Sequence, residues 1–524
     1  MKQLLIIPLL TFILLGASIS FAQDSLRLLA TIVGERECAS AGDVNGDGFM
    51  DIIAGSPCGR GYVKIYFGSS DFDTVADLKI IGEDEGPYGH YTSFGTTVAC
   101  AGDVNKDGYD DVIVGATIAY NPNNGADWAG KAYIFFGGDP MDTTTDVILQ
   151  DSDYFYFYGH SLSSAGDVNN DGYDDVIVGA NLGWWCDGCG FAYIYFGGED
   201  MDSVCDVYIQ GGWAEQLGES VAGIGDVNSD GYDDVLIGSS KAGESWGTGK
   251  ASIFFGGDPM DTIPDFTFWG DSIEFRNFGR NVASAGDVNG GAVPDILIGN
   301  TKKTRVFFGD SLLGTSSYVT LPVGYSISSA GDLNRDGYQD VIASDDKYPQ
   351  STYIFYGSSE MDGEADIILR AEDTTLAGFG IKVAGLNDIN GDGYDEIMVS
   401  SSGDSLRQGI IFIYTSCPTS IQEPTDPKEK TSFDLHQNYP NPFNHSTLIR
   451  YSLNAKGRTI VTLRIYNILG QVVRTLVDTD QATGKYKVLW DGEDQSAGTV
   501  SSGIYFYQLK MGDLSAVKEM VFLK

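Results

Sequence analysis

A nine-residue acidic phrase recurs seven times along this chain of 524 residues and constrains its fold more than any other feature. The first copy reads Asp43-Val-Asn-Gly-Asp-Gly-Phe-Met-Asp51, and successive copies start 60, 64, 59, 61, 45 and 56 residues apart. A repeat of this length predicts a solenoid or a propeller, because each unit buries its apolar faces against its neighbours. The copies are Asp43–Asp51, Asp103–Asp111, Asp167–Asp175, Asp226–Asp234, Asp287–Asp295, Asp332–Asp340 and Asp388–Glu396.

The residues around each copy predict four short strands. An apolar segment precedes the phrase and often begins with a large residue and Gly, as at Phe94-Gly95. A β-branched run such as Val112–Gly115 follows, then an aromatic run such as Tyr133–Gly137 and a last segment such as Asp146–Gln150. Gly punctuation without helical periodicity indicates four-stranded antiparallel sheets. We therefore predict an all-β fold with a seven-bladed β-propeller over residues 23–415; a β-helix is the alternative, although its rungs are much shorter.

The last repeat lacks a fourth strand, because only Ile397–Val399 and Ile410–Tyr414 follow Glu396 as strands. Leu26–Val33, just before the first acidic phrase, resembles the missing segment. We predict that it pairs at the outer edge of the last blade. Such pairing closes the ring with backbone hydrogen bonds and removes an exposed sheet edge.

The phrase places side-chain oxygens at positions 1, 3, 5 and 9 and usually Gly at position 6. Calcium takes about six to eight oxygen ligands, and a tight acidic loop supplies them. One such run alone is also typical of a solvated turn, but six complete copies favour six structural calcium sites. No ligand on a following helix is present, so a helix-loop-helix sensor is not expected. The predicted ligands are Asp43, Asn45, Asp47, Asp51, Asp103, Asn105, Asp107, Asp111, Asp167, Asn169, Asp171, Asp175, Asp226, Asn228, Asp230, Asp234, Asp332, Asn334, Asp336, Asp340, Asp388, Asn390, Asp392 and Glu396.

The fifth copy departs from the pattern. Gly291 replaces the acid of position 5, and Ala292 replaces the Gly of position 6. Asp287, Asn289 and Asp295 remain. We expect this seventh, degenerate site to be weak or empty.

The formal net charge of −41, from 73 acidic and 32 basic residues, excludes the basic footprint of a nucleic-acid binder. It also disfavours binding to anionic lipid. Aromatic residues make up 12% of the chain, which is far from the composition of a disordered acidic chain. Bound divalent cations therefore account best for the carboxylates.

Residues 1–22 are typical of a signal peptide, with Lys2, the apolar run Leu4–Leu15, and the small residues Ser20 and Ala22 at the cleavage site. The alternative is a membrane anchor, for which the run is short. No later segment is long and apolar enough to span a bilayer, so we do not expect an integral membrane protein. The protein is expected to be secreted or to lie on the outer cell surface. In that setting Cys186 and Cys189 favour a local disulfide, with a zinc site as the weaker alternative.

The pattern changes near the C-terminus, where the acidic phrases end. Residues 416–432 have the composition of a linker. Residues 433–524 alternate as strands and predict a small immunoglobulin-like β-sandwich. The expected strands are Thr447–Leu453, Thr459–Tyr466, Val472–Leu476, Gly484–Trp490, Gly503–Lys510 and Ala516–Leu523.

Two resemblances add to these patterns. The phrase Ala101–Asp111, with Phe94-Gly95 before it and Val114–Ala116 after it, resembles the FG-GAP repeat of the integrin α-subunit propeller. This resemblance covers about residues 26–415 and implies calcium loops on one face and partner recognition on the other. Adhesion is implied only as a class.

The C-terminal module is similar to the type A C-terminal sorting domain of the type IX secretion system. The segments that carry this resemblance are Asn438–Asn444, Ile465–Val473 and Gly503–Tyr507. It implies the secretion machinery as a partner, with passage across the outer membrane and then removal of the domain or surface attachment. The alternative is an ordinary binding sandwich.

Catalysis leaves no signature in the sequence: there is no Ser-His-Asp motif, phosphate loop or dinucleotide fingerprint. We expect a non-catalytic adhesion or ligand-binding module for an extracellular protein or glycan; the alternative is a polysaccharide-active enzyme, a glycosidase or lyase. In an antiparallel meander, the loops between the second and third strands and those between blades share the face opposite the acidic loops. Aromatic rings gather there and suit such a partner, unless they pack under their own loops. The candidate ligand-binding residues are Trp128, Trp184, Trp185, Trp213, Trp246, Tyr154 and Tyr156, with Tyr88, Tyr91 and Tyr158 nearby.

Overall fold

A computed structural model describes most of the chain, which divides into two compact units, Met1–Thr419 and Ser420–Lys524. The described residues contain no helix of the length and apolarity that crossing a membrane requires. The described ranges are 26–83, 92–120, 129–150, 155–183, 188–243, 247–271, 273–309, 318–347, 350–371, 378–402, 409–416, 432–435, 438, 441, 443–454, 458–467, 471–482, 484–495, 498, 500–511 and 514–523. The predicted signal peptide and residues 417–431 of the predicted linker lie outside them.

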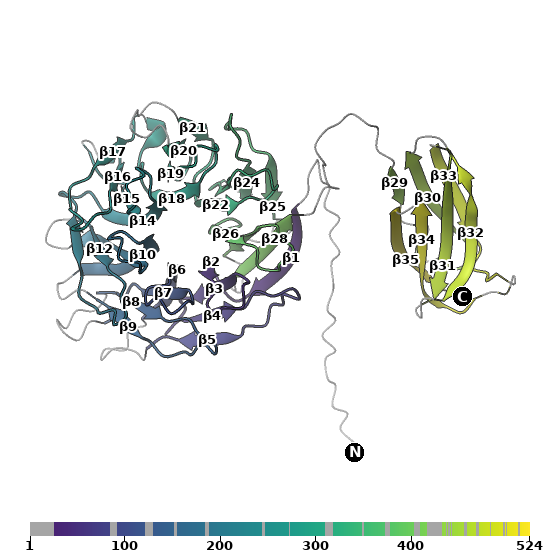
Figure 1. The fold of residues 1–524 in the computed structure, drawn as a ribbon, viewed down its shortest axis with the longest axis horizontal. Helices are drawn as coiled ribbons and strands as arrows, with labels where there is room; N and C mark the ends of the chain where they lie inside the picture. The colour runs from purple at the N-terminus through teal and green to yellow at the C-terminus, as the bar shows by residue number, and fades with distance from the viewer. Residues whose placement is uncertain are drawn as a thin grey trace, which may run out of the picture. The chain divides into compact units, whose positions relative to one another are not determined.

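In its described part the first unit holds seven antiparallel four-stranded sheets, which Figure 1 shows arranged around a common axis. The first three are β2 (Glu37–Gly42), β3 (Asp51–Ser56), β4 (Tyr62–Tyr66), β5 (Leu78–Ile81); β6 (Phe94–Gly102), β7 (Asp111–Ala116), β8 (Lys131–Phe135), β9 (Val147–Leu149); and β10 (Phe155–Gly166), β11 (Asp175–Gly183), β12 (Phe191–Tyr195), β13 (Val207–Gln210). The next three are β14 (Leu217–Gly225), β15 (Asp234–Ser239), β16 (Lys250–Phe254), β17 (Phe266–Trp269); β18 (Asn281–Gly286), β19 (Asp295–Gly299), β20 (Thr304–Phe307), β21 (Tyr318–Leu321); and β22 (Ile327–Gly331), β23 (Asp340–Ser344), β24 (Ser351–Phe355), β25 (Ile367–Arg370). A 3-10 turn, η2 (Ile273–Phe275), precedes β18.

The first strands of neighbouring sheets contact one another all round the ring, from β2 through β22 to the first strand of the last sheet, β26 (Val383–Asn387), which contacts β2 again. The second strand of each sheet is buried on both faces, as in Asp51–Ser56 and Asp111–Ala116. This burial explains the continuous β-branched runs after each acidic phrase. The core therefore lies between the sheets, and the predicted all-β propeller architecture is confirmed.

The ring closes through the N-terminal strand. The last sheet runs β26, β27 (Glu396–Ser401), β28 (Ile410–Ser416) and β1 (Leu26–Val33). Strand β1 pairs antiparallel with β28, from Leu26 opposite Ser416 to Val33 opposite Ile410. The predicted pairing of Leu26–Val33 at the outer edge of the last sheet is therefore confirmed.

The large residue of each aromatic-Gly pair packs between two sheets. Phe94 is buried and bridges in parallel to Gly61 of the first sheet, and its ring lies edge-on to that of Tyr133 at 5.3 Å. A Cβ atom on Gly61 would lie 2.0 Å from the Phe94 carbonyl oxygen, so only Gly permits this approach.

The second unit is a two-sheet sandwich. One sheet contains β29 (Ser432–Leu435), β30 (Thr447–Asn454) and β33 (Gly484–Trp490); the other contains β32 (Val472–Gln481), β31 (Thr459–Asn467), β34 (Gly503–Met511) and β35 (Leu514–Phe522). Both sheets contribute to one core, in which Trp490 and Tyr507 are fully buried. The six predicted strands are present, and β29 is an additional one.

Two of the segments that carry the second resemblance meet in this core. The Asn438 N–H donates to the Tyr507 hydroxyl at 2.9 Å, and the Asn438 amide donates to Thr447 Oγ1 at 2.9 Å. Phe443 adds backbone bonds to Val521 (3.0 Å) and Leu523 (2.8 Å). The segment before β30 is therefore fastened to the last strand of the opposite sheet.

Candidate metal loops and the opposite face

The seven acidic phrases form the turns between the first and second strands of the seven sheets, and they are named loops 1 to 7 in chain order. In loop 1 the Asp43 carboxylate accepts the N–H groups of Asp47 (3.0 Å) and Gly48 (2.9 Å). Asn45 Oδ1 accepts the Asp47 N–H at 2.9 Å, and Asp47 Oδ1 accepts the Phe49 N–H at 2.9 Å. The side chains of positions 1, 3 and 5 thus shape the loop backbone.

The acid of position 9 is buried and fastens the loop to the turn that follows the third strand of its own sheet. Asp51 is fully buried; its Oδ2 accepts the Val44 N–H at 3.0 Å and its Oδ1 accepts the Gly68 N–H at 2.7 Å. The same two bonds recur at Asp111, Asp175, Asp234, Asp295 and Asp340.

Burial raises the pKa of the position-9 acid in each of the six complete loops far above the usual range of a carboxyl group. The pKa of Asp51 rises to about 7, and that of Asp111 to about 8. The two backbone N–H bonds oppose the rise, whereas the nearby carboxylates of positions 5 and 1 add to it. Burial likewise raises the pKa of Asp175, Asp234 and Glu396 to about 7 and that of Asp340 to about 8. Each loop therefore holds a buried acid whose charge is costly without a counterion.

The donor set of the loops fits calcium. Every candidate ligand is a carboxylate or amide oxygen, which hard cations prefer, and an oxygen that accepts one N–H keeps a second lone pair. Across the described ranges, however, no three acidic, His or Cys side chains converge as a finished metal site. The carboxylates of positions 1 and 5 accept loop N–H groups instead, as in loop 1.

Loop 5 keeps the turn without its position-5 acid. Asp287 Oδ1 accepts the N–H groups of Gly290 (2.7 Å) and Gly291 (2.9 Å), and its Oδ2 accepts that of Ala292 (2.8 Å). Ala292 adopts a φ of 60°, the left-handed conformation that Gly adopts in the complete loops. The turn of loop 5 therefore forms without an acid at position 5.

Sequence reasoning missed the residue at position 8, which joins neighbouring loops. The carboxylate of Asp174, at position 8 of loop 3, accepts the N–H of Asp103, the first residue of loop 2, at 2.9 Å. The Asp174 N–H donates back to the Asp103 carbonyl at 3.3 Å. We call this pair of bonds the clasp. The doubled acids Asp110-Asp111, Asp174-Asp175 and Asp233-Asp234 were its visible signal.

The opposite face holds one described candidate for ligand binding. Trp213 lies between β13 and β14, and the residue is 73% exposed. Tyr156 lies in β10, but its side chain is not among the parts that the structure describes. The other candidates, Trp128, Trp184, Trp185, Trp246, Tyr154, Tyr88 and Tyr91, fall outside the described residues.

The expectation for Tyr158 was wrong. It is 1% exposed, and its hydroxyl lies 2.6 Å from that of Tyr195 inside the sheet. Tyr158 takes the place of Phe94 in the next sheet and bridges to Gly130, so it packs between sheets and not on a surface. Cys189 is disulfide-bonded, and its expected partner Cys186 lies outside the described residues.

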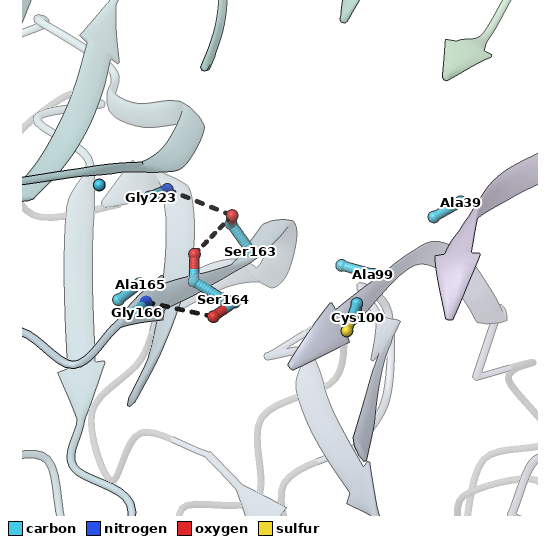
Figure 2. A pocket seen from close by; sticks show the side chains of 9 residues that line it. Ala39, Ala99, Cys100, Ser163, Ser164, Ala165, Gly166 and Gly223 are labelled. Atoms are coloured by element: carbon cyan, nitrogen blue, oxygen red, sulfur yellow. Dashed lines mark hydrogen bonds between the residues drawn. The ribbon is translucent and has the colours of Figure 1, made fainter. Parts of the chain in front are cut away.

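A cavity of about 380 Å³ lies between the first strands of the first four sheets (Figure 2). Small residues line it, among them Ala39, Ala99, Ser163 and Gly223. The Ser163 hydroxyl donates to the Ser164 carbonyl at 2.7 Å and accepts the Gly223 N–H at 3.2 Å. Burial raises the pKa of the Cys100 thiol to about 12. The cavity therefore presents neither a charged group nor a reactive thiolate.

Comparison with protein-family models gives matches in both units. A model of the FG-GAP-like repeat matches residues 43–114, and one of the FG-GAP repeat matches residues 94–135 and 158–183. The matched part of the first unit, residues 43–135 and 158–183, is therefore similar to FG-GAP repeats. A model of the FlgD Ig-like domain matches residues 446–513, which confirms the expected immunoglobulin-like sandwich.

Part of this chain is also similar to integrin α subunits. Integrin alpha-5 of Xenopus laevis is 29% identical over 211 residues, 38% of this chain and 19% of that protein. Human integrin alpha-8 is 30% identical over 230 residues, 41% of this chain and 20% of that protein. The matched region thus spans about a fifth of the length of these relatives.

Two solved structures are similar at low identity. One is PorZ of Porphyromonas gingivalis, an essential bacterial surface component of the type-IX secretion system, with 13% identity and a TM-score of 0.41 over 90% of this chain and 58% of that chain. The other is dimeric latent PorU from the same organism, with 11% identity and a TM-score of 0.17 over 95% of this chain and 34% of that chain. At these TM-scores the likeness assigns no function to this chain.

Proposed function

We propose that this chain is an exported, seven-bladed FG-GAP propeller, stabilised by calcium, that binds an extracellular protein or glycan without catalysis. The C-terminal sandwich would direct the chain through the type IX secretion machinery. The observation that carries the calcium proposal is the buried position-9 acid, with its raised pKa, beside the position-1 and position-5 carboxylates of its own loop. The integrin α relatives support a ligand-binding or adhesion role for the ring.

Calcium titration of the mature chain tests the metal proposal. We expect one ion per complete loop, with dissociation constants of about 10⁻⁴ to 10⁻³ M. The melting temperature of the ring should fall on chelation, because the clustered carboxylates lose their counterion. An unchanged melting temperature and no bound calcium would remove the basis of the proposal.

An array of glycans and matrix proteins, probed with the mature chain, tests the binding role. Trp213→Ala should weaken capture, since an exposed ring on the loop-rich face is a typical anchor. Trp269→Ala is the matched control, because Trp269 is also exposed at 48% but lies on the outermost strand β17. Release of a shortened glycan by the wild type would instead favour the polysaccharide-active alternative.

Secretion of a reporter tests the role of the sandwich. Residues 433–524 fused to an exported reporter should carry it across the outer membrane in a bacterium with a type IX system. The Asn438→Ala variant should secrete less, because it removes the amide bond to Thr447. Equal secretion of the reporter with and without the sandwich would contradict this part of the proposal.

A further inference from the structure

The clasp fixes the residue that shapes the preceding loop. Asp174 of loop 3 holds both backbone polar groups of Asp103 in loop 2, its carboxylate accepting at 2.9 Å and its N–H donating at 3.3 Å. Asp103 in turn organises loop 2, since its carboxylate accepts the N–H groups of Asp107 and Gly108, each at 3.0 Å. The geometry of loop 2 is therefore set partly by a carboxylate of loop 3.

A second link from the same neighbour reinforces the clasp. The Gly198 N–H, at the turn after β12, donates to the Val104 carbonyl of loop 2 at 2.8 Å. Loop 3 itself is shaped by its own Asp167 and Asp171, whose carboxylates accept N–H groups of its turn. Asp174 thus acts on the loop before it and is not one of the oxygens predicted to bind the ion of its own loop.

The clasp varies around the ring in an informative way. The bond to the position-8 carboxylate recurs in three other places. The acceptor carboxylates and the N–H groups that donate to them are Asp110 and Asp43 (2.8 Å), Asp233 and Asp167 (3.0 Å), and Asp395 and Asp332 (2.7 Å). Position 8 of loop 5, next to loop 4, is Pro294, which has neither an N–H nor a carboxylate. Pro294 nevertheless lies against the glycine before loop 4, since a Cβ atom on Gly225 would be 3.2 Å from its Cγ. Asp174 has the same place beside loop 2, where a Cβ atom on Gly102 would be 2.2 Å from its Oδ2.

We propose that Asp110, Asp174, Asp233 and Asp395 are positioning residues for the metal loop of the preceding blade, so that each of these loops binds its ion more tightly when the next blade clasps it. Each of these residues thus raises the calcium affinity of the loop before its own. Loop 4 binds calcium less tightly, because Pro294 stands at position 8 of the loop that follows it. This inference rests on the proposed calcium sites. It adds that a residue outside a loop's donor set determines the affinity of that loop.

A double-mutant cycle on the mature chain separates this role from a purely structural one. Asp107→Ala removes a predicted calcium ligand from loop 2, and Asp174→Ala removes the clasp on the same loop. We expect Asp174→Ala to weaken one calcium site about tenfold, or about 1.4 kcal/mol. Combined with Asp107→Ala, it should cause no further loss of calcium binding. If Asp174 acted on loop 3 instead, the double variant would lose a second site.

Two controls complete the cycle. Asp174→Asn keeps an oxygen that accepts the Asp103 N–H, so it should restore most of the affinity. Gln339→Ala truncates position 8 of loop 6, where the clasp is a backbone bond to Asp287 at 2.9 Å, and should leave the complete loops unchanged. Unaltered calcium affinities in Asp174→Ala, with normal binding by the wild type, would overturn the inference. Absence of binding by the wild type would instead reject the calcium proposal.

A gain of clasp keeps the inference testable should Asp174→Ala fail to fold. Pro294→Asp supplies an N–H and a carboxylate opposite Asp226, the first residue of loop 4, whereas Pro294→Ala supplies only the N–H. We expect the Asp variant to tighten one calcium site several-fold over the Ala variant. Equal affinities of the two variants would overturn the inference.

Discussion

At the scale of single residues, the glycine that precedes six of the seven acidic loops illustrates how closely neighbouring sheets approach. Gly102 has a φ of 80°, and a Cβ atom on it would lie 2.2 Å from Oδ2 of the clasping Asp174. Gly108, inside the same loop, has a φ of 93°, yet nothing lies within 4 Å of its Cβ position. The first Gly is therefore required by both conformation and contact, and the second by conformation alone.

Substitution of these two glycines separates the two costs. Gly108→Ala should lower the free energy of unfolding of the ring by about 1 kcal/mol, the cost of a left-handed Ala. Gly102→Ala should cost about 1–3 kcal/mol more, since the clash forces apart two blades. Urea unfolding followed by tyrosine and tryptophan fluorescence, with chelator present, measures both. Equal costs would show that the clasp yields without strain.

Protonation of the buried position-9 acids predicts an unusual pH dependence. Their pKa is about 7 to 8 in the folded ring, as at Asp51 and Asp111, against 3.8 for a free Asp. The folded state therefore binds more protons than the unfolded state between these values, so the contribution of these acids to stability is fully present below about pH 4 and is lost as the pH rises through 7 to 8. Urea midpoints in chelator should fall from pH 5 to pH 8. With saturating calcium the fall should largely disappear, because the ion replaces the proton.

At the scale of elements, the closing strand β1 is held by one buried row of side chains. Ile32 is 2% exposed, whereas its neighbour Val33 is 56% exposed, although both pair with β28. Ile32→Ala should therefore destabilise the ring by about 2–4 kcal/mol through the cavity that it leaves. Val33→Ala should change stability by less than about 0.5 kcal/mol. Thermal unfolding of the two variants provides the measurement, and similar losses would mean that β1 is not packed against the core.

Strands with alternating or fully apolar patterns were predictable from the sequence. Gly484–Trp490 was predicted with the observed bounds, and the pairing of Leu26–Val33 followed from the missing strand of the last repeat. Strand β32 was predicted to end at Leu476 but extends to Gln481, because its polar second half is an exposed edge that pairs only with β31. Edge pairing of polar residues leaves no periodic signal.

The candidate site was predictable only where the information is local. The nine-residue spacing marks the loop oxygens, but the clasp joins Asp103 to Asp174 across 71 residues. The burial of Tyr158 also depends on a neighbouring sheet, since it bridges to Gly130, which directly precedes β8 of that sheet. Such contacts depend on how successive sheets pack, which a single repeat does not encode.

At the scale of the whole molecule, the two units have separate cores and separate chemistry. The sandwich core is formed only by residues from Leu435 to Phe522, whereas the cores of the ring lie between its sheets. The acidic loops belong to the ring alone. The two units should therefore unfold independently.

Calorimetry of the mature chain should show two transitions. Chelation should lower the temperature of the ring transition and leave that of the sandwich unchanged, because only the ring carries loop carboxylates. The isolated fragment 432–524 identifies the sandwich transition. A single transition, or an equal shift of both, would contradict independent units.

The pairing of β1 with β28 also bears on the order in which the chain folds. Leu26–Val33 leaves the ribosome before the strand that it pairs with, which ends at Ser416. A contact between residues so far apart in sequence forms late, since its loop-closure entropy must be overcome first. Strand β1 therefore remains unpaired until nearly the whole ring has been synthesised, so closure of the ring is the last step of its assembly.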